Sequence, residues 1–386
     1  MQALVLGGAG AVCKETTRDL AQFSDFDAIT VADANLEAAQ ALVDEIGDNR
    51  LIPLAFEADQ VEGMAELFSG YNVVVNGLPF KYDLIVNQAC VQAGVNGLDL
   101  SSDDPQFALN DQAAKQGMLF VPGVGATPGI TNMMVARAAD WLETLDVVSI
   151  YFAAFRCLAP APGLLETTLW EFVPGESARH EAYFEDGGWH PTSPMSGGVD
   201  VQFHDQIGTQ KVYFVPHDES YTLPVSYPSL RHASVRGCFP PHVMEIMGSL
   251  MRSGMLSERE VVIGGKTVTS IEAVRQLLWS NPMSRENPVW AYGLVVEVEG
   301  TRNGRRATAT YRSHHPPQDK WGGPSAYFKN VGIPLSIGAQ MIAAGQTIGT
   351  GVLPPERALL PGPFFEALAQ RGIEVEETLV EGGRVA

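Results

Sequence analysis

Apolar residues in the first third of the chain form short continuous runs that alternate with segments of helical period. Residues 3–6 are the first run, and Val12, Thr16 and Leu20 then recur at every fourth position, which predicts a buried strand followed by a helix. The alternation continues, with strands expected at residues 29–32, 51–56, 72–77, 97–100 and 119–122. Because strands that alternate with helices form a parallel sheet covered on both faces, the pattern predicts a doubly wound α/β domain.

The pattern changes near residue 145. A long apolar strand is expected at 145–156, and it is followed by strands at 210–216, 233–239, 289–299 and 306–313 and by helices at 241–252 and 270–279. The last two strands flank Asn303-Gly304, a dipeptide typical of a tight hairpin. These elements predict an inserted α+β domain with an antiparallel sheet. The alternation of helices and strands then returns, with helices expected at 333–344 and 361–371 and a strand at 372–378.

A glycine cluster joins the first predicted strand to the first helix. We expect Gly8 to permit the tight turn and Gly10 to let backbone N–H groups approach a pyrophosphate at the helix N-terminus. Asp33 ends the next strand roughly 20 residues later, where an acid accepts hydrogen bonds from ribose hydroxyls. Cys13 stands where the pattern has a third glycine, so we expect a slight displacement of the helix. This order predicts a dinucleotide-binding Rossmann domain at 1–140, an inserted substrate and dimerisation domain at 141–324, and a C-terminal return to the Rossmann domain at 325–386.

The cofactor is expected to be NAD, with NADP the less favoured choice. Residues 34–37 contain no Arg or Lys to pair with a 2′-phosphate, and Asp33 would repel one. In a sheet of this kind the ligand lies beyond the carboxyl ends of the strands. The residues expected there, and hence the predicted cofactor contacts, are Gly8, Ala9, Gly10, Ala11, Val12, Cys13, Asp33, Ala34, Ala58, Asp59, Asn76, Gly77, Leu78 and Phe80.

Composition narrows the range of partners. The formal net charge of −20 over 386 residues disfavours nucleic acids and anionic membranes. The chain enters a strand at once and has no apolar run long enough to span a bilayer, so we expect a soluble cytoplasmic protein without a secretory signal. The four cysteines are scattered and the histidines lack ligand spacing, so no metal site is expected. His314 and His315 are interpreted as structural or surface residues.

Several segments resemble the saccharopine dehydrogenase-like family, and within it lysine 6-dehydrogenase. They are VLGGAGAVCKETTRDL, VVNGLPFKYDLIVNQACVQAGVNGLDL, PGVGATPGI, YPSLRHASVRG and GIPLSIGAQMIAAGQTIGTGVLPPE. Their order covers nearly the whole chain. The resemblance implies an NAD(P)-dependent oxidoreductase, usually dimeric, that acts on secondary or primary amines of amino acids.

Two departures from the family bear on the substrate. Saccharopine reductases carry an acid where this chain has Thr127, and they carry P-N-R-D-S where this chain reads P-H-D-E-S at 216–220. The missing arginine removes a bidentate clamp for a second substrate carboxylate. Saccharopine, with three carboxylates, is therefore not expected as the substrate. A mono-amino-acid or diamine-type substrate suits the change better.

Oxidation of an amine requires a base for the ammonium proton and a carbon held roughly 3–3.5 Å from the nicotinamide. Lys81 and Tyr82 follow the fourth strand, and Lys81 would need burial to act as the base; otherwise it is a solvated loop residue. Asp99, at the end of the fifth strand, is the other candidate, with a loop cap as the alternative. Asp103 and Asp104 are expected to cap the next helix, with contact to a cationic substrate as the alternative.

Substrate contacts are expected mainly from the inserted domain. Arg231 or Arg236 is favoured for the α-carboxylate, with Arg156 and Arg312 as weaker choices. Glu219 is a candidate for a distal ammonium, with a surface salt bridge as the alternative, and Thr127 completes the candidates.

The predicted function is oxidative deamination of a lysine-like amino acid, and a homodimer with a small-molecule amine or amino-acid substrate is expected. The alternatives are reductive C–N bond formation of the carboxynorspermidine, saccharopine or opine type, and a non-catalytic NAD(H)-binding protein.

Overall fold

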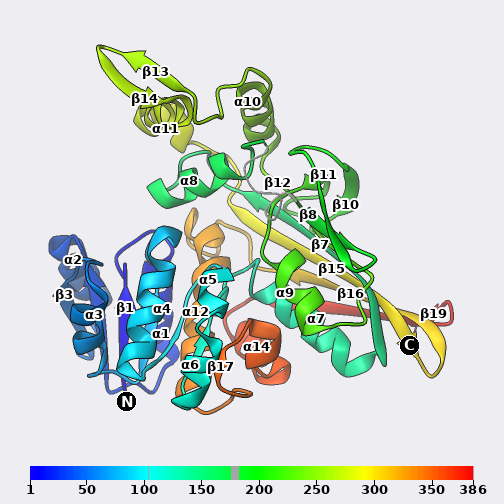
Figure 1. The fold of residues 1–386 in the computed structure, drawn as a ribbon, viewed down its shortest axis with the longest axis horizontal. Coiled ribbons are helices and arrows are strands. Elements are labelled where there is room, and N and C mark those ends of the chain that lie inside the picture. Colours follow the sequence, from blue (N-terminus) through cyan, green and yellow to red (C-terminus); the bar gives the residue numbers. More distant parts are fainter. Residues whose placement is uncertain (103, 175–181, 386) are drawn as a thin grey trace. The chain divides into compact units, whose positions relative to one another are not determined.

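A computed structural model describes residues 1–102, 104–174 and 182–385 (Figure 1). The chain forms two compact units. The first comprises Met1–Trp141 and Phe328–Val375, and the second comprises Leu142–Tyr327 and Glu376–Ala386. Asp103, one of the predicted helix caps, lies outside the described residues.

A seven-stranded parallel sheet forms the centre of the first unit, with strand order β17-β6-β5-β4-β1-β2-β3. Its strands are β1 (Gln2–Leu6), β2 (Ala28–Asp33), β3 (Leu51–Ala55), β4 (Val73–Asn76), β5 (Asn96–Leu98), β6 (Leu119–Val121) and β17 (Gly351–Val352). The predicted doubly wound parallel sheet is confirmed. The strand order reverses between β1 and β4, which is where sheets of this kind bind ligands.

Helices connect these strands, and the sheet's apolar side chains pack against them. Phe68, Phe120 and Leu6 are fully buried in this core. The helices are α1 (Cys13–Phe23), α2 (Leu36–Ile46), α3 (Val61–Phe68), α4 (Asp83–Ala93), α5 (Asp104–Phe107), α6 (Asn110–Lys115), α7 (Ile130–Trp141), α12 (Ser325–Ala343), α13 (Pro355–Ala358) and α14 (Pro361–Gln370), with a 3₁₀ turn at Phe80–Tyr82.

The second unit is built on a mixed sheet whose main path is β10-β11-β12-β7-β15-β16-β18-β19. The strands are β7 (Thr144–Phe155), β8 (Ala182–Glu185), β9 (Gly188–Pro191), β10 (Val199–Gln202), β11 (Thr209–Phe214), β12 (His232–Cys238), β15 (Ala291–Arg302), β16 (Arg305–His314), β18 (Glu374–Glu381) and β19 (Arg384–Val385). The predicted antiparallel sheet is present in β7, β15 and β16. However, β12 runs parallel to β7, because the long segment between them returns the chain to the starting edge of the sheet.

Turn and cap chemistry set several elements of the second unit. Asn303 and Gly304 have φ values of 50° and 69°, as the predicted two-residue hairpin between β15 and β16 requires. Thr269 caps α11 (Ser270–Ser280) by accepting a hydrogen bond from the Glu272 amide at 3.3 Å. The remaining elements are α8 (Pro162–Trp170), α9 (Glu219–Ser226), α10 (Pro241–Arg252), a 3₁₀ turn at Pro282–Arg285, and the hairpin of β13 (Glu260–Ile263) with β14 (Lys266–Thr269).

The C-terminal strand departs from the predicted return to the Rossmann domain. From Glu376 onward the chain belongs to the second unit, where β18 lies beside β16. The Tyr311 hydroxyl donates to Glu377 Oε1 at 3.0 Å, and His314 Nε2 lies 3.1 Å from Glu376 Oε2. Acidic side chains on β18 thus find partners on β16. The functional division of the chain into domains stays a prediction.

Candidate functional site

The loop between β1 and α1 has the geometry of a dinucleotide-binding turn. Gly7, and not Gly8 as expected, takes the left-handed conformation, with φ of 66°. Gly8 is required for a different reason, because a Cβ there would lie 2.8 Å from Val31 Cγ1 of β2. The Ala9 amide donates to Asp33 Oδ2 at 3.2 Å. The loop and the acid that ends β2 therefore lie side by side, as the predicted cofactor contacts require.

Cys13, at the third-glycine position, is accommodated by a glycine on the neighbouring strand. A Cβ on Gly77, just after β4, would lie 1.9 Å from Cys13 Sγ. The thiol occupies the space that a side chain at Gly77 would fill. Burial raises the pKa of Cys13 to about 12, so this cysteine remains a neutral packing residue.

Polar side chains at the carboxyl ends of β4 and β5 form a network. Asn76 Nδ2 donates to Asp83 Oδ1 at 2.7 Å, and Asn76 Oδ1 accepts from the Leu78 amide at 3.2 Å. The Ser101 hydroxyl donates to the other oxygen of Asp83. This network fixes the turn that follows β4, where part of the cofactor site was predicted.

The three predicted catalytic residues occupy different environments. Lys81 is exposed, with Nζ 5.0 Å from the ring centre of half-buried Tyr82, so it lacks the burial that a lysine base needs. Asp99 is fully buried and accepts from Gln106 Nε2 at 2.6 Å and from the Gly123 amide at 3.0 Å. This geometry suits the loop cap that the sequence left as the alternative for Asp99.

Five other residues predicted to contact the cofactor or the substrate in the first unit are more exposed than Asp99. Phe80 is 40% exposed, Ala34 and Asp59 are exposed, and Ala58 and Thr127 are half-buried. Thr127 lies in the loop between β6 and α7.

A buried polar cluster lies at one edge of the sheet in the second unit. Arg156 follows the end of β7, Phe239 follows the end of the parallel strand β12, and Tyr292 is near the start of the antiparallel strand β15, so all three meet at the same edge. Arg156 is 2% exposed, and its Nη2 donates to Thr168 Oγ1 of α8 at 2.6 Å. We use the name buried polar cluster for Arg156, Thr168, Glu171, His217, Glu219, Tyr292 and Tyr327.

Aromatic rings enclose the charged groups of this cluster. The Arg156 guanidinium carbon lies 4.9 Å from the Phe239 ring centre and 5.4 Å from that of Tyr327. The His217 ring lies 5.4 Å from Phe152, and Tyr292 lies 5.3 Å from Tyr327. Rings of this kind exclude water, which strengthens electrostatic interactions among the charges.

His217 and Glu219 form a close pair within the cluster. His217 Nδ1 lies 2.6 Å from Glu219 Oε2, and Glu219 has no exposed surface. Burial lowers the pKa of His217, but the adjacent Glu219 carboxylate more than offsets this and raises it to about 9. His217 is therefore protonated at neutral pH. The surface salt bridge considered for Glu219 is wrong, because the residue is buried and paired with His217.

Burial also shifts the other acids of the cluster. It raises the pKa of Glu171 to about 7, against the opposing effect of His217 and Arg156. It raises the pKa of the Tyr292 and Tyr327 hydroxyls as well. Groups with shifted pKa values gather at functional sites more often than elsewhere.

The arginines favoured from the sequence lie away from this edge. Arg231 is 72% exposed and pairs with Asp186 at 3.0 Å. Arg236 stacks 3.9 Å from the Phe214 ring centre, and its Nε donates to the Gly197 carbonyl. Arg312 is half-buried on β16. Arg156, ranked lower in the sequence, is the one within the buried polar cluster.

Sequence reasoning missed five members of the cluster: Thr168, Glu171, His217, Tyr292 and Tyr327. Only the His-x-Glu spacing of His217 and Glu219 carried a sign of an interaction. The two tyrosines are far apart in the sequence, and nothing before the fold marks them as neighbours.

The two adjacent histidines, interpreted from the sequence as structural or surface residues, differ: the side chain of His314 is 41% exposed, whereas His315 is buried. His315 is buried, accepts from the Tyr292 amide at Nε2 and lies 2.8 Å from the Pro316 carbonyl through Nδ1. Within residues 1–102, 104–174 and 182–385, no group of His, Cys, Asp and Glu has the arrangement of a metal site. In the same residues, no helix has both the length and the apolar surface to cross a bilayer.

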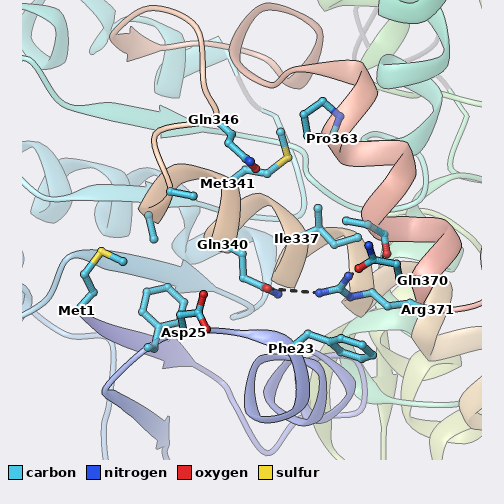
Figure 2. Close-up of a pocket in the computed structure, with 14 residues that line it drawn as sticks. Met1, Phe23, Asp25, Ile337, Gln340, Met341, Gln346, Pro363, Gln370 and Arg371 are labelled. Carbon is cyan, nitrogen blue, oxygen red and sulfur yellow. Dashed lines mark hydrogen bonds between the residues drawn. The ribbon is translucent and has the colours of Figure 1, made fainter.

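A pocket of about 240 Å³ lies elsewhere in the first unit (Figure 2). It is lined by Met1, by residues of α12 and α14, among them Gln340, and by Arg371, which follows α14. Met1 precedes β1, so this pocket lies at the amino end of that strand. The glycine loop and Asp33 lie at the carboxyl ends of β1 and β2, and the pocket is therefore not the dinucleotide site.

Two family models match the chain in succession. The saccharopine dehydrogenase NADP binding domain matches residues 3–121, and the saccharopine dehydrogenase C-terminal domain matches residues 125–373. The chain belongs to the saccharopine dehydrogenase family. Family membership and the glycine loop together make it a pyridine-nucleotide-dependent oxidoreductase.

Similar proteins include two curated dehydrogenases. Carboxyaminopropylagmatine dehydrogenase of Synechocystis is 25% identical, with 98% of each chain covered. The NADP-dependent, L-glutamate-forming saccharopine dehydrogenase of Schizosaccharomyces pombe is 21% identical, covering 99% of this chain and all of the relative. Among solved structures, apo saccharopine dehydrogenase from Saccharomyces cerevisiae has a TM-score of 0.72 at 16% identity, covering 98% of this chain and 99% of its own. This last likeness shows the fold.

The residues present fit a bound dinucleotide. The glycine turn is tight, because a Cβ on Gly10 would lie 3.0 Å from the Gly7 carbonyl oxygen, and it leads into the N-terminus of α1, where backbone N–H groups would bind a pyrophosphate. Asp33 lies where a ribose hydroxyl would donate to its carboxylate.

Proposed function

We propose that this protein is an NAD-dependent dehydrogenase that joins an amine to a carbonyl compound, one of them an amino acid, by reducing the C=N bond between them. The observation that carries the proposal is the end-to-end similarity to a carboxyaminopropylagmatine dehydrogenase. Its name describes an amino-acid group carried on an amine. This favours reductive C–N bond formation over the deamination of lysine that the sequence suggested first.

Asp33 supports the choice of NAD. Its carboxylate lies against the glycine loop, and no cation follows it at residues 34–37. A 2′-phosphate there would meet a negative charge without a partner. One relative's name and the family description mention NADP, so both cofactors are compared in the assay below.

The reaction adds a hydride to the imine carbon and a proton to the nitrogen, so that C=N becomes CH–NH. The bound nicotinamide supplies the hydride. The chain's own residues bind the dinucleotide, exclude water and hold charges near the substrate. His217 holds a proton at neutral pH beside Glu219, and Arg156 presents a buried positive charge to a carboxylate.

Purified protein should be incubated with NADH, a panel of amines and an amino-acid aldehyde. The expected result is a fall in absorbance at 340 nm and a product whose mass equals amine plus aldehyde minus water plus two hydrogens. NADPH in place of NADH should give a slower reaction. NADH consumption without the joined product would overturn reductive C–N bond formation.

Oxidative deamination of a lysine-like amino acid is the second candidate. The residue that favours it is Asp218, in the segment 216–220. Saccharopine reductases carry an arginine there that binds a further substrate carboxylate, and an acid does not bind one. Growth of absorbance at 340 nm with lysine and NAD, without a carbonyl compound, would select this reaction. Binding of NADH with no turnover in either assay would select the non-catalytic alternative.

We also propose that the protein acts as a homodimer, as the family resemblance implies. Light scattering coupled to size-exclusion chromatography should give twice the mass of one chain. A mass equal to that of a single chain at assay concentration would overturn this.

A further inference from the structure

Two buried charged groups of the second unit each keep one atom without a hydrogen-bond partner. Arg156 Nε, a donor, and Glu171 Oε2, an acceptor, have no partner among the described residues. A buried polar atom left unsatisfied costs about 1–3 kcal/mol, and more when the group is charged. Such atoms in a native fold call for an explanation, and a ligand that is bound during function is one.

The two atoms belong to neighbouring side chains. Arg156 Nη2 donates to Thr168 Oγ1 at 2.6 Å. Glu171 follows Thr168 by three positions, just beyond the end of α8, and so lies on the same face of that helix. Arg156 and Glu171 also influence each other electrostatically. One small ligand can therefore meet both groups.

The charges of the cluster select the kind of ligand. Arg156 and His217 are positive and Glu219 is negative, and the four charges of the cluster balance when Glu171 is ionised, as it becomes when an ammonium binds. His217 and Glu219 already satisfy each other at 2.6 Å. A ligand with a net charge would disturb this balance, whereas one with a positive and a negative group side by side would preserve it. The α-amino and α-carboxyl groups of an amino acid are such a pair.

We infer that Arg156 and Glu171 form the subsite for the amino-acid end of the substrate, with Arg156 binding the α-carboxylate and Glu171 binding the α-ammonium. This assignment rests on the proposed function, because it takes an amino acid to be part of the substrate. The C-terminal end of α8 adds a partial negative charge that favours an ammonium beside Glu171.

Proton release gives this subsite a measurable property. The pKa of Glu171 is raised to about 7 by burial, so near pH 7 a large fraction of the side chain is protonated. Arg156 and His217, from β7 and the loop before α9, are the charged groups that oppose this shift. An ammonium bound to Oε2 favours the ionised form, and binding then releases a proton to the buffer.

L-lysine and two truncated analogues test the subsite by calorimetry in the presence of NAD. Cadaverine lacks the α-carboxylate, and 6-aminohexanoate lacks the α-amine. Wild-type protein should bind lysine at least about tenfold more tightly than either analogue, as expected for hydrogen bonds to charged groups. Lysine binding at pH 7 should release protons, detected as a dependence of the heat on the ionisation enthalpy of the buffer.

Glu171→Gln keeps the shape of the side chain and removes its charge. In this variant lysine should bind no more tightly than 6-aminohexanoate, and the proton release should vanish. Arg156→Met should reduce lysine to the affinity of cadaverine. Glu166→Gln, the same substitution on α8 at a residue outside the cluster, is the matched control and should behave as wild type.

The results separate the subsite from the proposed function. Lysine binding that is equal in wild type and Glu171→Gln, or wild-type protein that does not distinguish lysine from its analogues, would overturn the subsite. Turnover in the amine-plus-aldehyde assay together with either result would leave the proposed function standing. Tighter binding of lysine than of its analogues, without turnover in the assay, would support the subsite and contradict the proposed reaction.

Discussion

At the scale of single residues, Cys13 and Gly77 depend on each other. The Cys13 thiol occupies the space that a Cβ at Gly77 would fill, at a separation of 1.9 Å. We predict that Gly77→Ala lowers the free energy of unfolding by about 1–3 kcal/mol, the usual cost of overpacking a core. Urea denaturation of the apo protein measures this change.

Cys13→Ala supplies the matched test of that explanation. The double variant Cys13→Ala/Gly77→Ala should recover most of the loss, because the smaller side chain vacates the contested space. A loss of stability that is additive across the two substitutions would contradict direct contact between them.

Asp33 is the residue that we propose selects the cofactor, again through local contacts. Its carboxylate lies beside the glycine loop, with the Ala9 amide 3.2 Å away. We predict that Asp33→Ala weakens NADH binding by about tenfold, as expected for the loss of a hydrogen bond to a charged group. The ratio of NADH affinity to NADPH affinity should fall as well. Fluorescence titration with both cofactors measures this, and Asp140→Ala, an exposed acid on α7 outside the predicted cofactor contacts, is the control. Unchanged NADH affinity in Asp33→Ala would contradict the predicted ribose contact.

His217 should give stability a characteristic pH dependence. Its pKa rises on folding from 6.5 to about 9, so the stabilisation is complete below pH 6.5 and is lost as the pH rises to 9. Within that range the folded state holds the extra proton, and the free energy of unfolding falls by up to about 1.4 kcal/mol per pH unit. Denaturation midpoints measured from pH 6 to 9.5 should show this slope in wild type and a flatter one in His217→Gln. Parallel slopes would contradict the pairing with Glu219.

The candidate site was only partly visible in the sequence. Asp33 and the glycine loop were predicted because their spacing is local and has a known physical purpose. The buried arginine was ranked below Arg231 and Arg236, because burial depends on contacts made after folding. Glu171 carried no sign at all, since its environment comes from strands and loops remote in the sequence.

At the scale of elements, α1 is joined to the returning helices α12 and α14 by buried polar contacts. The Thr16 hydroxyl donates to the Gly332 carbonyl at 2.9 Å. Asp19 accepts from Arg371 Nε at 2.7 Å and from the Ser336 hydroxyl at 2.7 Å. Burial raises the pKa of Asp19 in spite of Arg371, so the carboxylate depends on this partner. Figure 2 shows Arg371 beside Gln340 in this region.

We predict that Arg371→Met destabilises the protein by about 3–5 kcal/mol, because it leaves Asp19 buried without its counter-ion. The double variant Asp19→Leu/Arg371→Met should be less destabilised than the single one. Lys211→Met, which breaks the exposed ion pair with Asp200, should cost about 1 kcal/mol or less. Chemical denaturation compares the three, and equal losses for the two single variants would contradict a special role for the buried pair.

Elements with local signals were predicted well, and those set by distant pairing were not. The first-unit strands and the Asn303-Gly304 hairpin follow from apolar runs and turn chemistry. The parallel pairing of β7 with β12 joins segments separated by the whole of 156–231, and no local pattern specifies its direction. The two-residue strand β17 is too short to produce a periodic pattern.

At the scale of the whole molecule, the chain passes between its two units three times, after Trp141, Tyr327 and Val375. The change in rhythm near residue 145 and its return near 325 could be predicted, because they alter the type of element. The last crossing could not be predicted, because a short strand of alternating residues fits the edge of either sheet.

That last crossing leads to a prediction about how the units share stability and function. A stop codon after Val375 removes most of β18 and with it the contacts of Glu377 with Tyr311 and of Glu376 with His314. All of the predicted dinucleotide contacts lie in the first unit, so NADH should bind with the wild-type dissociation constant. The second unit should be less stable, and the newly exposed edge of β16 should promote association between molecules. NADH titration, limited proteolysis and light scattering measure the three effects. Loss of NADH binding in a truncated protein whose second unit stays protease-resistant would contradict the assignment, because the C-terminal strand would then support the nucleotide site instead of the mixed sheet.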